Sequence, residues 1–195
     1  MSKVFGRYII TIALLGCMLG CKEETQPTAF ENLLQEGYEI FYSDTLRFDQ
    51  KEFVAVALKQ HNEDSLIEAT MDEIARPLLI LEKKPDSKFD IALRNDKVIL
   101  CGACGGMFGD PLDIIEADGK SLTISHHGGS RYRWTRHISF EFLAEQQGWF
   151  LSSDKGISYD SMNPEGELEE IEYTSVDTNQ PLAFGAFNSS THYEE

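Results

Sequence analysis

The chain has 195 residues, of which 33 are acidic and 17 are Lys or Arg, so its formal net charge is −16 at pH 7. A protein of this charge repels phosphate backbones and anionic lipid headgroups. Nucleic acids are therefore excluded as expected partners, and so is attachment to a bilayer through a basic patch. The apolar content of 42% is ordinary for a globular protein, and the length suits one domain around one hydrophobic core.

Residues 1–21 indicate export. Two basic residues among the first seven are followed by an uncharged apolar run that ends at Gly20. This run is shorter than the ~20 residues of a membrane-spanning helix and has the organisation of a secretory signal peptide. Its end resembles a bacterial lipoprotein signal, in which a small residue precedes a cysteine that is acylated after cleavage. Cys21 in "MLGC" is the favoured acylation site because the apolar run continues to Gly20, and Cys17 in "LLGC" is the alternative.

Residues 22–30 are polar and are expected to tether the acylated end to the domain. Two short helices are predicted after them. Each begins with a capping box, in which Ser or Thr is followed three residues later by Glu. The first helix is expected within residues 30–35 and the second over residues 65–75, close to a proline that ends it.

The remainder of the chain consists of apolar stretches separated by turn sequences rich in Gly, Asn and Asp. Stretches of this kind predict antiparallel strands joined as a meander. They cover residues 38–42, 52–59, 78–83, 89–94, 97–101, 113–117, 121–127, 132–143, 149–160 and 168–176. A turn is assigned to Arg94–Asp96, and the last strand is acidic, which is typical of a sheet edge that avoids pairing with other chains. We expect one all-β domain of sandwich or propeller-blade type over residues 31–187, followed by a flexible tail at 188–195.

Cys101 and Cys104 stand three residues apart in the stretch "VILCGACGGMFGDPLD". Such a pair can form a disulfide, a redox-active dithiol, or half of a zinc site. A reactive thiol is usually stabilised by the N-terminus of a following helix, but residues 105–111 hold three glycines and a proline and cannot sustain one. For zinc, His126 and His127 are candidate ligands, yet neighbours in a strand point to opposite faces. A disulfide that closes a glycine loop is therefore favoured, and no metal or other cofactor is expected.

The segment 132–142 has a period of two along its whole length. One face carries Tyr132, Trp134, Arg136, Ile138, Phe140 and Phe142. This face is expected to join the core, because its aromatic side chains bury large apolar areas, with Arg136 placed at the rim of the core.

The opposite face gathers basic side chains. It carries Arg131, Arg133 and His137, with His126 or His127 close to them across the hairpin. A basic stripe on a strongly acidic domain indicates a docking place for a carboxylate, a phosphate or an acidic glycan. Cross-strand pairing with acidic residues of the same protein is the alternative.

Sequence signatures of common enzyme classes are absent from the chain: it has no GxSxG, no HExxH, no phosphate-binding glycine loop and no EF-hand loop. Asp110 in the "GDP" turn is expected to stabilise a loop, and it has no carboxylate partner at a spacing that indicates catalysis. We therefore assign no catalytic residue and expect a protein that is not an enzyme. A hydrolase with an unrecognised site is an alternative.

Four segments carry a resemblance to a known group. They are "RPLLILEK", "ALRNDKVILCGACGG", "FGDPLDIIEADGKSLTISHHGGSRYRW" and "ISFEF". From Arg76 to Phe142 the chain resembles a group of bacterial envelope proteins and lipoproteins with no assigned activity. Many of these also carry an acidic loop similar to the calcium loops of integrin-type FG-GAP/VCBS propeller repeats. At the matching place this chain keeps Asp44, Asp49 and Glu52 but lacks the glycine and the regular acidic spacing, so no calcium is expected.

Taken together, these features favour a non-enzymatic protein of the bacterial cell envelope, held to the outer or inner membrane by an N-terminal lipid, that binds a partner protein or an anionic glycan. The candidate surface consists of Arg131, Arg133, His137, His126 and Asp110, together with the glycine loop at 102–110. A thiol–disulfide or zinc-binding envelope protein centred on Cys101 and Cys104 is the alternative.

Overall fold

A computed structural model describes residues 30–70, 73–163 and 165–192. The expected signal peptide, the candidate acylation sites Cys17 and Cys21 and the tether up to residue 29 lie outside the described residues. Within the described ranges, no helix has both the length and the apolar character needed to cross a membrane.

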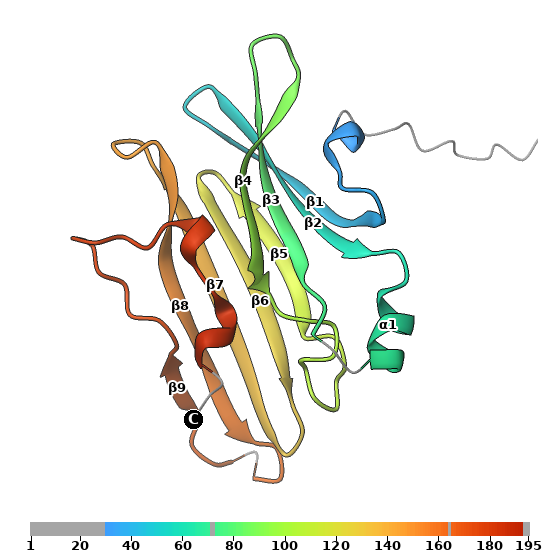
Figure 1. The fold of residues 1–195 in the computed structure, drawn as a ribbon. Helices are drawn as coiled ribbons and strands as arrows, with labels where there is room; N and C mark the ends of the chain where they lie inside the picture. Colours follow the sequence, from blue (N-terminus) through green and yellow to red (C-terminus); the bar gives the residue numbers. More distant parts are fainter. Residues whose placement is uncertain (1–29, 71–72, 164, 193–195) are drawn as a thin grey trace, which may run out of the picture.

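The described residues form two antiparallel sheets that share one hydrophobic core (Figure 1). The first sheet has the order β1 (Tyr38–Phe48), β2 (Lys51–Gln60), β3 (Arg76–Lys83) and β4 (Phe89–Ile99). The second has the order β5 (Leu112–Asp118), β6 (Ser121–Gly129), β7 (Tyr132–Leu143), β8 (Gly148–Asp160) and β9 (Glu169–Glu172). In each sheet the spatial order of the strands follows the sequence. The predicted all-β meander is therefore confirmed.

The helical elements of the described ranges are short. They are the helix α1 (Glu63–Thr70) and the 3-10 turns η1 (Glu31–Leu33), η2 (Phe184–Ala186) and η3 (Ser189–His192). The helix expected at residues 65–75 thus begins and ends earlier than predicted. Residues 73–75 belong to no helix, and β3 begins at Arg76 with Pro77 as its second residue. The helix expected near residue 30 is reduced to the three-residue turn η1.

The main core lies between the two sheets and receives alternate side chains from both. Ile80 of β3 comes from the first sheet, and Ile124 of β6 and Phe140 of β7 come from the second, all with no exposed surface. Burial of a side chain of this size contributes about 1.5–3 kcal/mol. The inward face predicted for residues 132–142 is confirmed for its second half, whereas Tyr132, at the beginning of the strand, is 63% exposed.

A smaller core lies on the other side of the first sheet. There Val56 and Leu79 pack with Phe30, and the partly buried Leu33 and Leu34 of the N-terminal segment pack against them. The central strands β2 and β3 are therefore covered on both faces. This double burial explains why their sequences, "FVAVAL" and "LLIL", are continuous apolar runs rather than alternating ones.

The two open sides of the sandwich are closed in different ways. On one side β1 contacts β5 directly. On the other, the C-terminal segment with η2 and η3 contacts β4, and η2 also contacts β8 (Figure 1). Its Phe184 and Phe187 meet the ring of Phe140 edge-on, with centroids 5.0 and 5.4 Å apart. The last part of the chain therefore contributes to the core.

This packing differs from the flexible tail that we expected from residue 188. Ser189 is buried, and its hydroxyl group donates a hydrogen bond to the carbonyl oxygen of Lys97 at 2.6 Å. The polar composition of the segment concealed this contact, because the partner of Ser189 is a backbone group of β4. Residues 193–195 lie outside the described residues.

The first sheet differs from the prediction in a second respect, because β4 passes through Arg94–Asp96 without a turn. The side chain of Asn95 is buried, and its amide donates to the carbonyl oxygens of Phe184 and Phe187. A residue type typical of turns is thus kept in a strand by the C-terminal segment. The other extension is in β1, which continues to Phe48 and ends in a two-residue turn at Asp49 and Gln50, both with positive φ.

A buried ion pair joins β7 to β8 inside the core. Nε and Nη2 of Arg136 donate to the two carboxylate oxygens of Asp154, each at 2.8 Å, and both side chains are fully buried. Nη1 of Arg136 donates to the carbonyl oxygen of Ser189 at 2.7 Å, and the hydroxyl group of Thr174 donates to Asp154. The ring of Tyr173 lies 4.4 Å from the guanidinium. Arg136 is therefore an interior anchor rather than the rim residue that we expected.

His126 lies next to Arg136, on the inward face of β6. It is 1% exposed, and its Nε2 accepts a hydrogen bond from the backbone N–H of Leu100 at 3.2 Å. Burial, together with repulsion from Arg136, lowers the pKa of His126 from 6.5 to about 3. The imidazole is therefore neutral in the folded protein at neutral and mildly acidic pH.

The first prediction concerns the buried ion pair. Replacing Asp154 by Asn leaves the charge of Arg136 without its counter-charge in the core, so we expect the free energy of unfolding to fall by about 3–5 kcal/mol. Urea denaturation followed by circular dichroism measures the change. The matched control is Asp160→Asn at the end of β8, which removes the partly exposed partner of Arg131 and should shift the midpoint far less. Equal losses in the two variants would contradict an interior role for the pair.

The second prediction concerns pH. In the unfolded chain His126 titrates near pH 6.5, whereas the folded protein keeps it neutral down to about pH 3. The unfolded state therefore binds the extra proton between these values, and stability falls as the pH falls, by up to about 1.4 kcal/mol per pH unit. A His126→Gln variant, in which the amide oxygen can accept from Leu100, should flatten the slope of stability between pH 7 and pH 5. The same substitution at His61, whose side chain is 61% exposed, should leave most of the slope in place.

Candidate functional site

Cys101 and Cys104 form a disulfide directly after β4, with Cα atoms 5.2 Å apart. The backbone N–H of Cys104 donates to the carbonyl oxygen of Cys101 at 3.0 Å, so the four residues make a closed turn. Residues 102–110 contain no helix, and the cysteines therefore lack the helix N-terminus that commonly lowers the pKa of a redox thiol. With the two sulfur atoms joined, the pair has no thiolate to offer a metal.

The residues 102–110, here called the glycine loop, extend the edge of the second sheet. Since β5 begins only at Leu112, the last residues of β6 have no strand beside them on that edge. The glycine loop occupies this place. The backbone N–H of Gly129 donates to the carbonyl oxygen of Gly105 at 3.0 Å, and Gly106 forms a parallel bridge with Gly129.

Glycine is required where the glycine loop meets the β6–β7 hairpin. A Cβ atom on Gly128 would lie 2.5 Å from the ring of Trp134 and 3.0 Å from the Cα of Gly105. Gly129 has φ of 101°, and a Cβ atom there would lie 2.1 Å from the carbonyl oxygen of Tyr132. The contact between the two segments is thus formed by Gly105 and Gly106 of the glycine loop and by Gly128 and Gly129 of the hairpin.

Docking of the glycine loop carries two apolar side chains to the basic stripe. The ring of Phe108 lies edge-on to the ring of His127, 5.6 Å away, and the guanidinium of Arg133 lies 5.1 Å from the centroid of Phe108. Met107 is 85% exposed and Phe108 is 46% exposed. We call the surface formed by Met107, Phe108, His127 and Arg133 the loop–hairpin surface.

The two arginines of the predicted stripe have different surroundings. Nε and Nη2 of Arg131 donate to the carboxylate of Asp160 at 3.0 and 2.7 Å, and its guanidinium lies over the ring of Tyr132. For Arg131, the alternative interpretation of the stripe, pairing with an acidic residue of the same protein, is therefore correct. Arg133 is exposed and makes no ion pair with any residue that the structure describes. Among the arginines of the stripe, Arg133 is therefore the one whose charge a ligand can contact.

The two histidines of the "SHH" sequence point to opposite sides of the second sheet. His126 is enclosed in the core and does not contribute to the exposed face, although we included it in the candidate surface. Its neighbour His127 takes that place, beside Phe108. The strict alternation of a strand explains this outcome, because only one of two adjacent side chains can face outward.

Asp110 is the last residue of the glycine loop and has a structural role. Its Oδ1 accepts hydrogen bonds from Nη1 of Arg76 at 2.7 Å and from the backbone N–H of Leu112 at 3.0 Å. Nε of Arg76 also donates to Glu63 of α1 at 2.8 Å. Asp110, Arg76 and Glu63 therefore connect the glycine loop to β3 and α1. Its involvement in this network leaves Asp110 out of the loop–hairpin surface.

His137 lies further along the outward face of β7, in a row of cross-strand neighbours. That row runs from Ser125 through His137 and Lys155 to Glu172, and the adjacent row runs from His127 through Thr135 and Ile157 to Glu170. The outward face of the second sheet is thus polar, with Ile157 as an apolar member. Arg133 belongs to the next row and lies opposite Tyr159.

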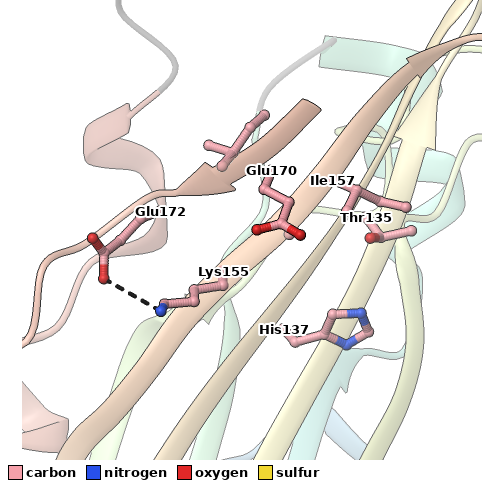
Figure 2. A pocket seen from close by; sticks show the side chains of 8 residues that line it. Thr135, His137, Lys155, Ile157, Glu170 and Glu172 are labelled. Carbon is pink, nitrogen blue, oxygen red and sulfur yellow. Dashed lines mark ion pairs between the residues drawn. The ribbon is translucent and has the colours of Figure 1, made fainter. Parts of the chain in front are cut away.

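A hollow of about 480 Å³ lies on this face beside β9. Figure 2 shows the side chains of Thr135, His137, Lys155, Ile157, Glu170 and Glu172 around it. Nζ of Lys155 lies 3.7 Å from Oε1 of Glu172. The hollow was not predicted from the sequence, because it depends on the short strand β9 pairing with residues 155–158 of β8.

The hollow also borders a serine–histidine contact, Oγ of Ser125 to Nδ1 of His137 at 2.8 Å. A nucleophilic serine must be reachable by the substrate, and Ser125 is only 4% exposed. The contact is therefore a cross-strand hydrogen bond that orients the imidazole. Among the described residues, no group of three or more His, Cys, Asp and Glu side chains is placed to hold a metal ion.

The sequence analysis brought the whole glycine loop and the basic stripe into one candidate surface, but it did not single out Met107 and Phe108 within the loop. The signal was present: two large apolar residues stand between glycines in a loop, where no core position is available to them. Comparison of the chain with protein-family models, with curated proteins and with solved structures found no match.

Proposed function

We propose that the protein is a non-enzymatic binding module of the bacterial cell envelope, held by an N-terminal lipid, that docks a partner protein through the loop–hairpin surface. The observation that carries the proposal is the exposure of the neighbouring residues Met107 and Phe108, with the guanidinium of Arg133 stacked on the ring of Phe108. Met, aromatic residues and Arg are the types enriched at protein–protein interfaces. The fixed backbone contact between the glycine loop and the hairpin holds these side chains in place before a partner arrives.

A partner protein fits this surface better than an anionic glycan. Of the cations predicted for the stripe, Arg131 is neutralised by Asp160, and His137 lies in the row that ends at Glu172. Arg133 alone is a weak basis for binding a polyanion. Exposed apolar side chains of the size of Met107 and Phe108 contribute to protein docking, because their burial removes apolar surface from water.

The third prediction tests the docking surface in the producing cells. A photo-crosslinking residue at position 107 should give a discrete product with one partner protein. The control position is Ile91, which is 44% exposed on the first sheet and should give no such product. With the partner purified, Phe108→Ala and Arg133→Ala should each weaken binding at least tenfold, which is the size expected of central interface residues. Thermal melting should show that both variants remain folded.

Equal crosslinking at positions 91 and 107 would contradict the proposal. So would crosslinking at position 107 that persists unchanged in a Phe108→Ala, Arg133→Ala double variant. The variant Arg47→Ala removes an arginine whose side chain is 69% exposed on β1 and serves as the matched charge control. It should bind the partner as the unaltered protein does.

A further inference from the structure

The hollow beside β9 has the chemistry to receive a cation on an apolar stem. Its lining includes two carboxylates, of Glu170 and Glu172, and one ammonium, of Lys155. The ammonium is directed to Glu172, at 3.7 Å. Glu170 is exposed and makes no ion pair with any residue in the described ranges. One carboxylate of the hollow is therefore available to a ligand.

The lining around Glu170 is apolar or neutral. Ile157 is its direct cross-strand neighbour, and Thr135 follows on β7. In Figure 2 the side chains of Ile157 and Thr135 lie together, to the right of the carboxylate of Glu170 and above the imidazole of His137. A long side chain that ends in a positive group can place its methylene groups over such residues and its charge on the carboxylate. Lys and Arg are the side chains of this kind.

The net charge of the whole protein also favours a cationic ligand. A chain with a formal charge of −16 attracts cationic partners and raises their rate of association. The hollow is also continuous with the loop–hairpin surface. Its row of Thr135 and Ile157 includes His127, whose ring meets Phe108. A partner seated on Met107 and Phe108 can therefore extend along the outward face to β9.

We propose that the hollow binds a Lys or Arg side chain of a basic segment of the partner protein, with its stem on Ile157 and its charge on Glu170. This inference rests on the proposed function, because it names the chemistry of the partner that the loop–hairpin surface docks. It assigns the acidic strand β9 a second role, in recognition, besides that of a charged sheet edge.

The fourth prediction uses small probes and therefore needs no knowledge of the partner. The labelled protein is titrated with Nα-acetyl-lysine methylamide at 150 mM salt, which screens charges more than about 8 Å apart, and binding is followed by NMR. We expect saturable shifts at Thr135, Ile157 and Glu170. The norleucine analogue, which lacks the ammonium group, should bind at least fivefold more weakly. Glu170→Gln should weaken binding of the lysine probe at least threefold, and Ile157→Ser should weaken it to a similar extent.

The matched control is Glu167→Gln, which makes the same change of charge at an exposed residue that does not line the hollow. Equal effects of the substitutions at positions 167 and 170 would mean general attraction by an acidic protein and would overturn the inference. Tighter binding of glucosamine than of the lysine probe would overturn it as well, in favour of a cationic sugar. If a partner crosslinks at position 107 but the lysine probe does not bind in the hollow, this inference alone is removed. If the probe binds but no partner crosslinks at position 107, the result counts against the docking function.

Discussion

The bidentate contact between Arg136 and Asp154 is the interaction on which the rest of the molecule depends. It is buried, it joins the two longest strands of the second sheet, and it holds the C-terminal segment through the carbonyl oxygen of Ser189. An ion pair in this position is costly to desolvate and therefore tolerates few alternative arrangements. Because side chains alternate along a strand, fixing Arg136 inward also fixes Thr135 and His137 outward. The register of the exposed face is thus determined from inside the core.

The candidate surface depends on a second constraint, the contact of glycine with glycine between the glycine loop and the β6–β7 hairpin. A Cβ atom on Gly128 would lie only 3.0 Å from the Cα of Gly105, so the two backbones approach closely there. The disulfide of Cys101 and Cys104 closes the loop at its base, and Asp110 fixes the other end through Arg76. Cysteine, glycine and aspartate therefore act together as a support, and the residues that they present to solvent are Met107 and Phe108.

The sequence predicted the surroundings of a side chain correctly where they follow from the residue pattern of its own strand. The alternation in residues 132–142 identified the inward and outward faces of β7, and the apolar runs identified β2 and β3. It was uninformative where a contact comes from a distant segment. Asn95 has the character of a turn residue and lies in a strand because Phe184 and Phe187, near the end of the chain, supply its hydrogen-bond acceptors. Arg136 was expected at the rim because nothing in its own strand reveals Asp154. The hollow beside β9 depends on the pairing of two strands, which no single segment encodes.

The closure of the sandwich by the segment with η2 and η3 has a consequence for the order of folding. A chain is synthesised from its N-terminus, so Phe184, Phe187 and Ser189 emerge after every strand of the two sheets. Until they emerge, Phe140 has no aromatic cover on that side, the carbonyl acceptor of Arg136 is missing, and the edge of β4 is bare. A nascent chain can therefore pair its strands but cannot complete its core.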